Sequence, residues 1–202
     1  MDAGGKVETP KAKAAQRSYF TTSDLATIAI FGALQFVLQY FAGNINFIPG
    51  DERNIVAFPV GFMAAITYLR TKKVGAVGAT TLIAGILQTL NTGFIPVMFE
   101  WVGATIGFEA VIIGAHVTRG KAKTWALCLA ASCLMLGRAI GVTIGLLIFF
   151  PQYVLGSFTT QVLAATYIIF NGVTPFIIAA IGAYAAIRLF LNMGLLQKSV
   201  LE

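Results

Sequence analysis

The chain has 202 residues, of which 57% are hydrophobic and 11% are charged, and its mean hydropathy is +0.82. Ordinary soluble domains carry about 25% charged residues, so this composition excludes a soluble domain and indicates an integral membrane protein. The formal net charge is +6, but the basic residues are spread over separate polar segments. They do not form the single patch that a nucleic-acid-binding surface needs.

The first 22 residues form a polar segment that contains four Lys or Arg residues. We predict a cytoplasmic leader here and not a cleavable signal peptide, because the segment has no apolar core. Six apolar segments follow, separated by breaks rich in Gly, Asn, Pro or basic residues. They are Leu25 to Ala42, Ile55 to Leu69, Val74 to Leu90, Gly93 to Val117, Trp125 to Phe150 and Val162 to Leu191. We therefore predict an all-α membrane domain of six transmembrane helices over residues 23–192, followed by a cytoplasmic tail at 193–202.

The positions of Lys and Arg predict how this domain is oriented. Twelve of the fourteen basic residues lie in the leader, the second connection, the fourth connection and the tail, whereas the outer connections hold only Arg53. Cytoplasmic connections of membrane proteins are enriched in Lys and Arg. Both termini are therefore predicted to lie in the cytoplasm, with an even number of spans in a multi-pass protein of the plasma membrane. The first helix is expected to begin with Ser23 or Asp24 as its N-cap.

The fourth apolar segment carries two acidic residues, Glu100 and Glu109, together with Trp101. A carboxylate inside a membrane is energetically expensive and is a functional candidate by default. Nine residues at about 100° per residue turn a helix through about 900°, which places the two glutamates on opposite faces. Glu100 shares its face with Gly103 and Gly107, a smooth strip that allows a neighbouring helix or a ligand to approach. We therefore expect the two acids to have different roles.

The remaining basic residue, Arg138, lies within the fifth apolar segment. Its level in the membrane makes either glutamate a possible counter-ion, and it could serve as a ligand contact or be neutralised by a neighbouring helix. Gly137, Gly141 and Gly145 form a strip of small residues that favours close contact with another helix.

The first and last segments each present a distinct polar or small-residue face. In the first, Ala29 and Ala33 are a small-xxx-small pair, and the pair Gln35 and Gln39 lies on a different side of the helix and is expected to face inward. In the last, Tyr167 and Asn171 are one helical turn apart and could together hydrogen-bond a small molecule. Pro175 follows and should loosen the helix near Asn171, because it has no N–H to donate.

Motifs for nucleotide binding or hydrolytic catalysis are missing from the sequence. There is no phosphate-binding GxxxxGK, no Ser/His/Asp set and only one histidine, His116. Cys128 and Cys133 point about 140° apart on one helix, which is not a metal-ligand arrangement. We predict no cofactor and no metal site, and if the protein drives uphill transport, another component must supply the energy.

These features together resemble the substrate-binding S components of energy-coupling factor (ECF) vitamin transporters. The resemblance rests on six spans with short connections in about 200 residues, the AxxxA-like pair Ala29 and Ala33, and a long first outer connection, and it covers Leu25 to Leu191. The stretch from Tyr68 to His116 is most similar to S components assigned to thiamine or its hydroxymethylpyrimidine precursor. These share a basic turn into a small-residue helix and then a Gly-x-Glu-Ala-Val sequence, here Gly107 to Val111.

The resemblance implies a pocket near the outer membrane face that is closed by the first outer connection. It also implies that Ala29 and Ala33 dock on a transmembrane coupling subunit attached to two cytoplasmic ATPases. The leading hypothesis is therefore capture of a small vitamin or precursor, with Trp101 or Tyr153 as a stacking wall. An acid beside an aromatic ring would suit a flat cationic heterocycle. The candidate polar and aromatic contacts are Asn91, Glu100, Trp101, Arg138, Tyr153, Tyr167 and Asn171.

Two other classes of function stay open at this point. The first is an intramembrane enzyme acting on a lipid or isoprenoid substrate, with Glu100 or Glu109 as general base and Arg138 holding an anionic group. The second is a structural or channel-like protein in which Arg138 and a glutamate only neutralise each other. Co-purification of a small molecule would separate the binding subunit from both.

Overall fold

The computed structural model describes residues 19–45, 52–115, 123–156, 161–162, 165–166 and 169–195, without the side chains of residues 43–45, 52–53 and 170–171. Within these residues every regular element is a helix, as expected for an all-α chain. The elements are α1 (Thr22–Ile45), α2 (Glu52–Thr71), α3 (Ala76–Thr92), α4 (Pro96–Gly114), α5 (Thr124–Phe149), the short α6 (Gln152–Leu155), the π-helix η1 (Ile169–Val173) and α8 (Thr174–Asn192).

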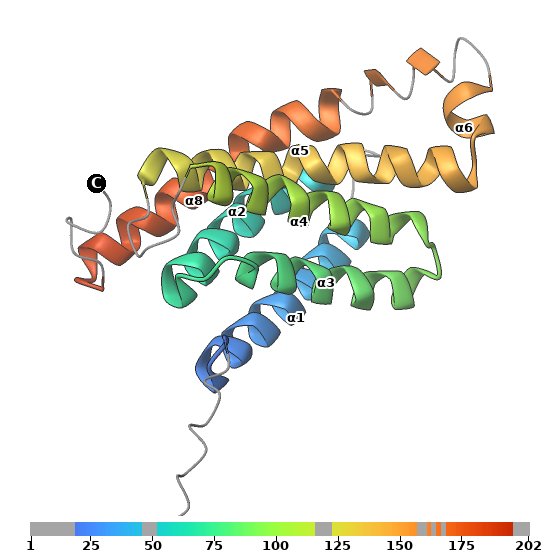
Figure 1. Ribbon diagram of the computed structural model, residues 1–202. Coiled ribbons are helices and arrows are strands. Elements are labelled where there is room, and N and C mark those ends of the chain that lie inside the picture. Colours follow the sequence, from blue (N-terminus) through green and yellow to red (C-terminus); the bar gives the residue numbers. More distant parts are fainter. Residues whose placement is uncertain are drawn as a thin grey trace, which may run out of the picture.

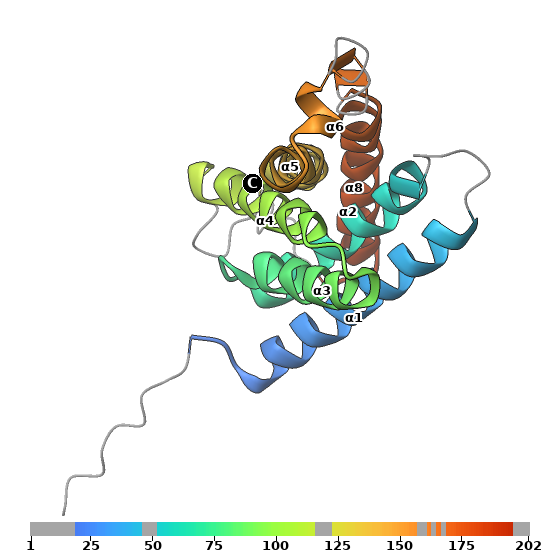
Figure 2. The ribbon, with the colours of Figure 1, turned by 90° about the vertical axis from the view of Figure 1, so that its right-hand side faces the viewer.

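The long helices form a bundle in which α4 and α5 lie side by side (Figure 1). Helix α2 packs against α8, and α8 also contacts α5. On the other side of the bundle, α3 lies between α4 and α1 (Figure 2). The core consists of aliphatic, alanine and aromatic side chains, most of them from α2, α4, α5 and α8. Helix α2 thus packs against α8, α1 and α5, and α3 packs against α4 and α1.

Four of the described helices are long and apolar enough to cross a membrane, namely those at Thr22–Ala42, Pro96–Gly114, Thr124–Phe149 and Thr174–Asn192. Helix α3 has 17 residues, slightly fewer than the usual length of a span, and α2 carries Arg70 in its last turn. Both nevertheless match the predicted apolar segments closely. The chain is thus a membrane protein with at least these four candidate spans, and the count of six stays a prediction.

Glycines bring α4 and α5 into backbone contact. A Cβ atom on Gly103 would lie 2.1 Å from the carbonyl oxygen of Gly137, and one on Gly137 would lie 2.2 Å from that of Gly103. Gly107 and Gly141 meet the carbonyl oxygens of Cys133 and Phe99 at similarly short distances. This confirms the prediction that the glycine strips of the fourth and fifth segments permit close helix contact. Because the two backbones are this close, side chains on the facing sides of α4 and α5 can form hydrogen bonds with each other.

The connection between α2 and α3 lies close to the beginning of α1 and to the end of α8. Lys73, between α2 and α3, donates to Asp24 near the start of α1 at 2.7 Å, and its ammonium group lies 5.7 Å from the Tyr19 ring centre. The last turn of α2 and the end of α8 also lie together, because Arg70 and Phe190 border the same small cavity. Helix α6 lies at the other end of α5 (Figure 1). Which side of the membrane this end faces stays a prediction from the distribution of Lys and Arg.

The beginning of α1 differs from the predicted cap. Thr21 and Asp24 bond reciprocally: Asp24 Oδ2 accepts from the Thr21 N–H at 2.8 Å, and the Asp24 N–H donates to Thr21 Oγ1 at 3.2 Å. This pattern is a capping box, in which Thr21 is the N-cap and Asp24 is the third helical residue. The prediction of Ser23 or Asp24 as N-cap was wrong, because the reciprocal bond favours the threonine three residues before the acid.

The last apolar segment changes from π-helix to α-helix at the beginning of α8. The π-helix η1 at Ile169–Val173 leads into α8, where Pro175 occupies the first turn. Proline is well tolerated there because its missing N–H has no intrahelical partner at a helix start. The loosening expected from Pro175 therefore takes the form of a π-helical turn that runs directly into α8.

Candidate functional site

Arg138 on α5 forms an ion pair with Glu100 on α4 inside the bundle. The Arg138 side chain is fully buried and Glu100 is 4% exposed. Arg138 Nε donates to Glu100 Oε1 at 2.8 Å, Nη2 contacts the same oxygen, and Nη2 also donates to Gln39 Oε1 on α1 at 3.1 Å. Glu100 is therefore the counter-ion of Arg138, and the pair joins α1, α4 and α5.

Trp101 forms a wall beside this ion pair. The guanidinium carbon of Arg138 lies 4.4 Å from the Trp101 ring centre, and the Trp101 Nε1–H donates to Gln88 Oε1 on α3 at 2.8 Å. Gly85 allows this approach, because a Cβ there would lie 2.6 Å from Trp101 Cβ. The ring is fully buried. One face of the indole contacts the guanidinium of Arg138, and its N–H edge bonds the amide of Gln88.

Several buried polar atoms on the helices around this ion pair have no hydrogen-bond partner. Both the Nε2 and the Oε1 of Gln35 are buried without a partner, as are Arg138 Nη1 and the Thr89 hydroxyl. Leaving a buried donor or acceptor unsatisfied costs about 1 to 3 kcal/mol, so native proteins rarely tolerate several together. Groups of this kind are satisfied by ordered water or by a polar ligand. We refer to Gln35, Gln39, Gln88, Thr89, Glu100, Trp101 and Arg138 as the polar cluster.

Glu109 lies in a separate environment between α4 and α3. Its Oε1 accepts from the Gly78 N–H at 2.9 Å, in the first turn of α3, where the N-cap residue Gly75 has no side chain to provide a cap. Beside it, the hydroxyls of Thr81 and Thr105 are 2.7 Å apart. A carboxylate is stabilised by the unpaired N–H groups and the dipole at a helix N-terminus. The two glutamates thus have different partners, as their opposite faces predicted.

The other predicted contacts lie outside the polar cluster. Asn91 is exposed at the end of α3. Tyr153 is 65% exposed on α6, and its ring packs edge-on against Phe150, which stacks on Phe94. Tyr167 and the side chain of Asn171 lie outside the described residues. The structure therefore brings Glu100, Trp101 and Arg138 together but gives Asn91 and Tyr153 positions nearer the α6 end.

Sequence reasoning left Gln35, Gln39, Gln88 and Thr89 out of the candidate site. Gln35 and Gln39 were expected to face inward, and both are buried, at 0% and 6% exposure. Their spacing of four residues on the inward face of the helix was the signal that could have placed them in the site. For Gln88 the signal was weaker: one amide in an otherwise apolar helix, whose partner depends on how α3 packs against α4.

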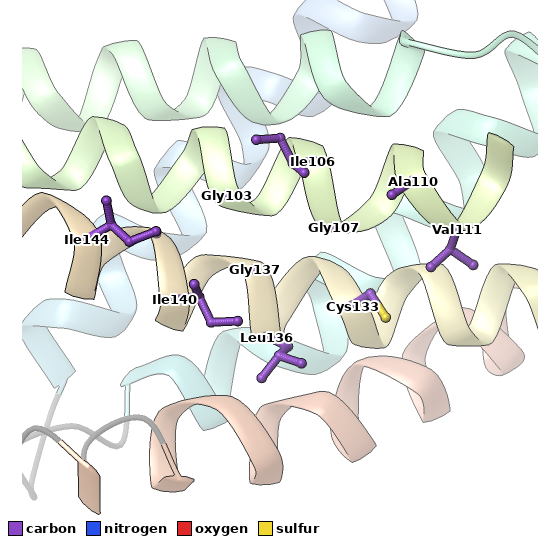
Figure 3. A pocket seen from close by; sticks show the side chains of 11 residues that line it. Gly103, Ile106, Gly107, Ala110, Val111, Cys133, Leu136, Gly137, Ile140 and Ile144 are labelled. Atoms are coloured by element: carbon purple, nitrogen blue, oxygen red, sulfur yellow. The ribbon is translucent and has the colours of Figure 1, made fainter. Parts of the chain in front are cut away.

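A second feature is a groove of about 420 Å³ along the outside of the α4–α5 seam (Figure 3). It is bordered by glycines, Ala110 and aliphatic side chains such as Ile106, Ile140 and Ile144. Apart from the Cys133 thiol, the groove presents no side chain that can hydrogen-bond. It therefore offers apolar contacts only and is separate from the polar cluster.

Comparison with known proteins identifies the fold. A solved structure described as the crystal structure of an S-component of ECF transporter is similar to this chain, with a TM-score of 0.56 and 16% sequence identity. The similarity covers 86% of this chain and 87% of that chain. No protein-family model and no curated protein matches the sequence. The chain therefore has the fold of an ECF transporter S component, which is the fold that the resemblance in the sequence implied.

Proposed function

We propose that this chain is a membrane-embedded substrate-binding subunit of an ECF-type transporter. It captures a small vitamin or vitamin precursor at the outer face of the membrane, and thiamine or its pyrimidine moiety is the best candidate. It is not an enzyme, and ATP hydrolysis takes place on the partner subunits. The observation that carries the proposal is the polar cluster, where an ion pair and several unpartnered buried groups lie inside an S-component fold.

The separate environments of the two glutamates favour this function over an intramembrane enzyme. Glu100 is engaged with Arg138, and Glu109 bonds the start of α3, so the described part of the chain does not bring the two acids together as an acid–base pair. A binding site has no such requirement. It needs a few well-placed polar groups in apolar surroundings, which the polar cluster provides.

The proposed partner surface is the face of α1 that carries Ala29 and Ala33. Both alanines are exposed, whereas Gln35 and Gln39 on the other side of the helix are buried. Exposed small residues allow the backbone of a partner helix to approach closely. We propose that this face docks on a transmembrane coupling subunit that is attached to two cytoplasmic ATPases.

Mass spectrometry of small molecules extracted from the detergent-purified chain tests the substrate-binding role. The wild-type protein should carry a bound molecule, and the double variant Glu100→Gln/Arg138→Met, which removes both buried charges together, should lose it. Glu109→Gln is the matched control and should retain it. Equal retention by wild type and the double variant, or no molecule in the wild type after expression in a vitamin-containing medium, would contradict the proposal.

A further inference from the structure

Gln35 presents a donor and an acceptor that both lack partners. Its side chain is fully buried on α1, and neither Nε2 nor Oε1 forms a hydrogen bond. In a carboxamide these two atoms lie side by side in one plane, and rotating the amide by 180° exchanges them without removing the pair. The complementary group is therefore a planar edge with an N–H next to an acceptor. Glutamine and asparagine bind such an edge on adenine with two hydrogen bonds.

Gln35 lies one helical turn before Gln39, the residue of α1 that bonds the ion pair. Gln39 follows it by four residues on the same face of α1, and Gln39 accepts from Arg138 Nη2 at 3.1 Å. Arg138 Nη1, on the guanidinium that bonds Gln39, has no partner and is a further donor. A ring that pairs with Gln35 could thus place a second acceptor toward Arg138.

The charges of the polar cluster do not favour a cationic ligand. The carboxylate of Glu100 is paired with the guanidinium of Arg138, and that guanidinium lies over the face of Trp101. The other members of the cluster, three glutamines and Thr89, are neutral. A cation entering here would meet an unpartnered N–H of Arg138 and an aromatic face already in contact with a cation.

We infer that Gln35 is a substrate-contacting residue and that it recognises a neutral planar ring or amide through a donor next to an acceptor. This inference rests on the proposed substrate-binding function and deepens it. It separates the two parts of thiamine: the aminopyrimidine has this edge and is neutral, whereas the thiazolium ring carries the positive charge. Recognition depends on the neutral edge.

Calorimetric titration of the detergent-purified full chain tests the inference with two probes, 4-amino-5-hydroxymethyl-2-methylpyrimidine and thiamine. The wild-type protein should bind the pyrimidine, and the thiazolium ring should add less than about tenfold to the affinity. Gln35→Leu should weaken binding of the pyrimidine by about tenfold or more, because two hydrogen bonds are lost. The exposed Gln152 provides the control, since Gln152→Leu makes the same change outside the cluster and should leave binding unchanged.

The stability of the ligand-free variant separates recognition from a structural role. Because the amide of Gln35 has no partner without ligand, Gln35→Leu should leave the melting temperature unchanged or raise it. Gln35→Met serves the same purpose if the leucine variant does not fold. Absence of pyrimidine binding by the wild type, unchanged affinity in both Gln35 variants, or a preference for thiamine of tenfold or more overturns the inference. If the wild type still carries a small molecule that the Glu100/Arg138 double variant loses, the substrate-binding function stands while this inference fails.

Discussion

The guanidinium carbon of Arg138 lies 4.4 Å from the centre of the Trp101 ring, while its nitrogen atoms bond the carboxylate of the preceding residue, Glu100. Two consecutive residues of α4 thus hold one side chain of α5 from different sides. This is possible because Gly103 and Gly137 bring the two helix backbones into contact. The site and the helix seam therefore depend on each other.

The first prediction concerns the two charges of this ion pair. Glu100→Gln or Arg138→Met alone should destabilise the protein by about 3 to 5 kcal/mol, because each leaves the other charge buried without its partner. The double variant should recover most of this loss, since no charge is left buried. Unfolding free energies of the wild type, the two single variants and the double variant, measured in mixed micelles, form a double-mutant cycle that gives the coupling energy of the pair. Additive effects of the two single changes would show that the pair is not coupled.

The second prediction concerns the glycine seam between α4 and α5. Gly137→Ala would place a Cβ 2.2 Å from the Gly103 carbonyl oxygen, so the helices must separate, and the protein should lose about 1 to 3 kcal/mol. Gly114, at the end of α4, has open space around an added Cβ and provides the control. Gly114→Ala should be neutral or slightly stabilising. Similar melting temperatures for the two variants would contradict the close contact.

The third prediction assigns a structural role to Glu109. Glu109→Ala removes the acceptor for the Gly78 N–H and should cost about 0.5 to 2 kcal/mol, as for loss of a helix cap. Glu109→Gln keeps an oxygen acceptor and should lose less. Ligand affinity should be nearly unchanged in both variants, and it should fall in Glu100→Gln, because that change removes the carboxylate that holds Arg138 in the polar cluster. Calorimetry on the three variants decides, and loss of binding only at Glu109 would place the site elsewhere.

The fourth prediction concerns docking of the coupling subunit. Replacing both Ala29 and Ala33 by Leu should obstruct close helix approach and abolish uptake in cells, while the isolated chain still binds its ligand. Exposed Leu34 on the same helix is a suitable control position, and Leu34→Ile should leave uptake intact. Uptake of radiolabelled substrate and ligand titration are compared for each variant. Parallel loss of uptake and binding would mean that the alanines support the fold of the chain itself.

The fifth prediction concerns topology and follows from the distribution of Lys and Arg. Single cysteines are introduced at Lys6, Asn46, Thr92, Lys121 and Ser157 in a chain with Cys128 and Cys133 replaced by alanine. An impermeant thiol reagent added to sealed cells should label only the variants at Asn46, Thr92 and Ser157. All of these positions except Thr92 lie outside the described residues. Labelling at Lys121 would exclude the predicted orientation.

Much of the arrangement could be predicted from the sequence because apolar segments and glycine spacing are local signals. The first five apolar segments matched α1 to α5, the two glutamates faced different neighbours, and the strip at Gly137 and Gly141 did contact α4. Which glutamate pairs with Arg138 could not be predicted, because both acids were possible at the expected depth. That choice depends on which face of α4 turns toward α5.

The roles of the glutamines were harder to predict for the same reason. An amide in an apolar helix shows that a polar partner exists but does not show on which helix it lies. Gln88 meets Trp101 only because α3 packs beside α4, and Gln39 reaches Arg138 across a long sequence separation. Tertiary neighbours, more than local pattern, determine these contacts.

Helix α1 carries both the exposed alanine face and the buried pair Gln35 and Gln39. Under the proposed roles, substrate and coupling subunit bind different sides of one helix. Thermodynamic linkage then requires reciprocity: if docking changes the affinity for substrate by some factor, substrate must change the affinity for the coupling subunit by the same factor. A coupling subunit that displaces α1 and so weakens substrate binding would therefore bind more tightly to the empty subunit than to the loaded one. Release of the substrate would then compete with selection of the next loaded subunit.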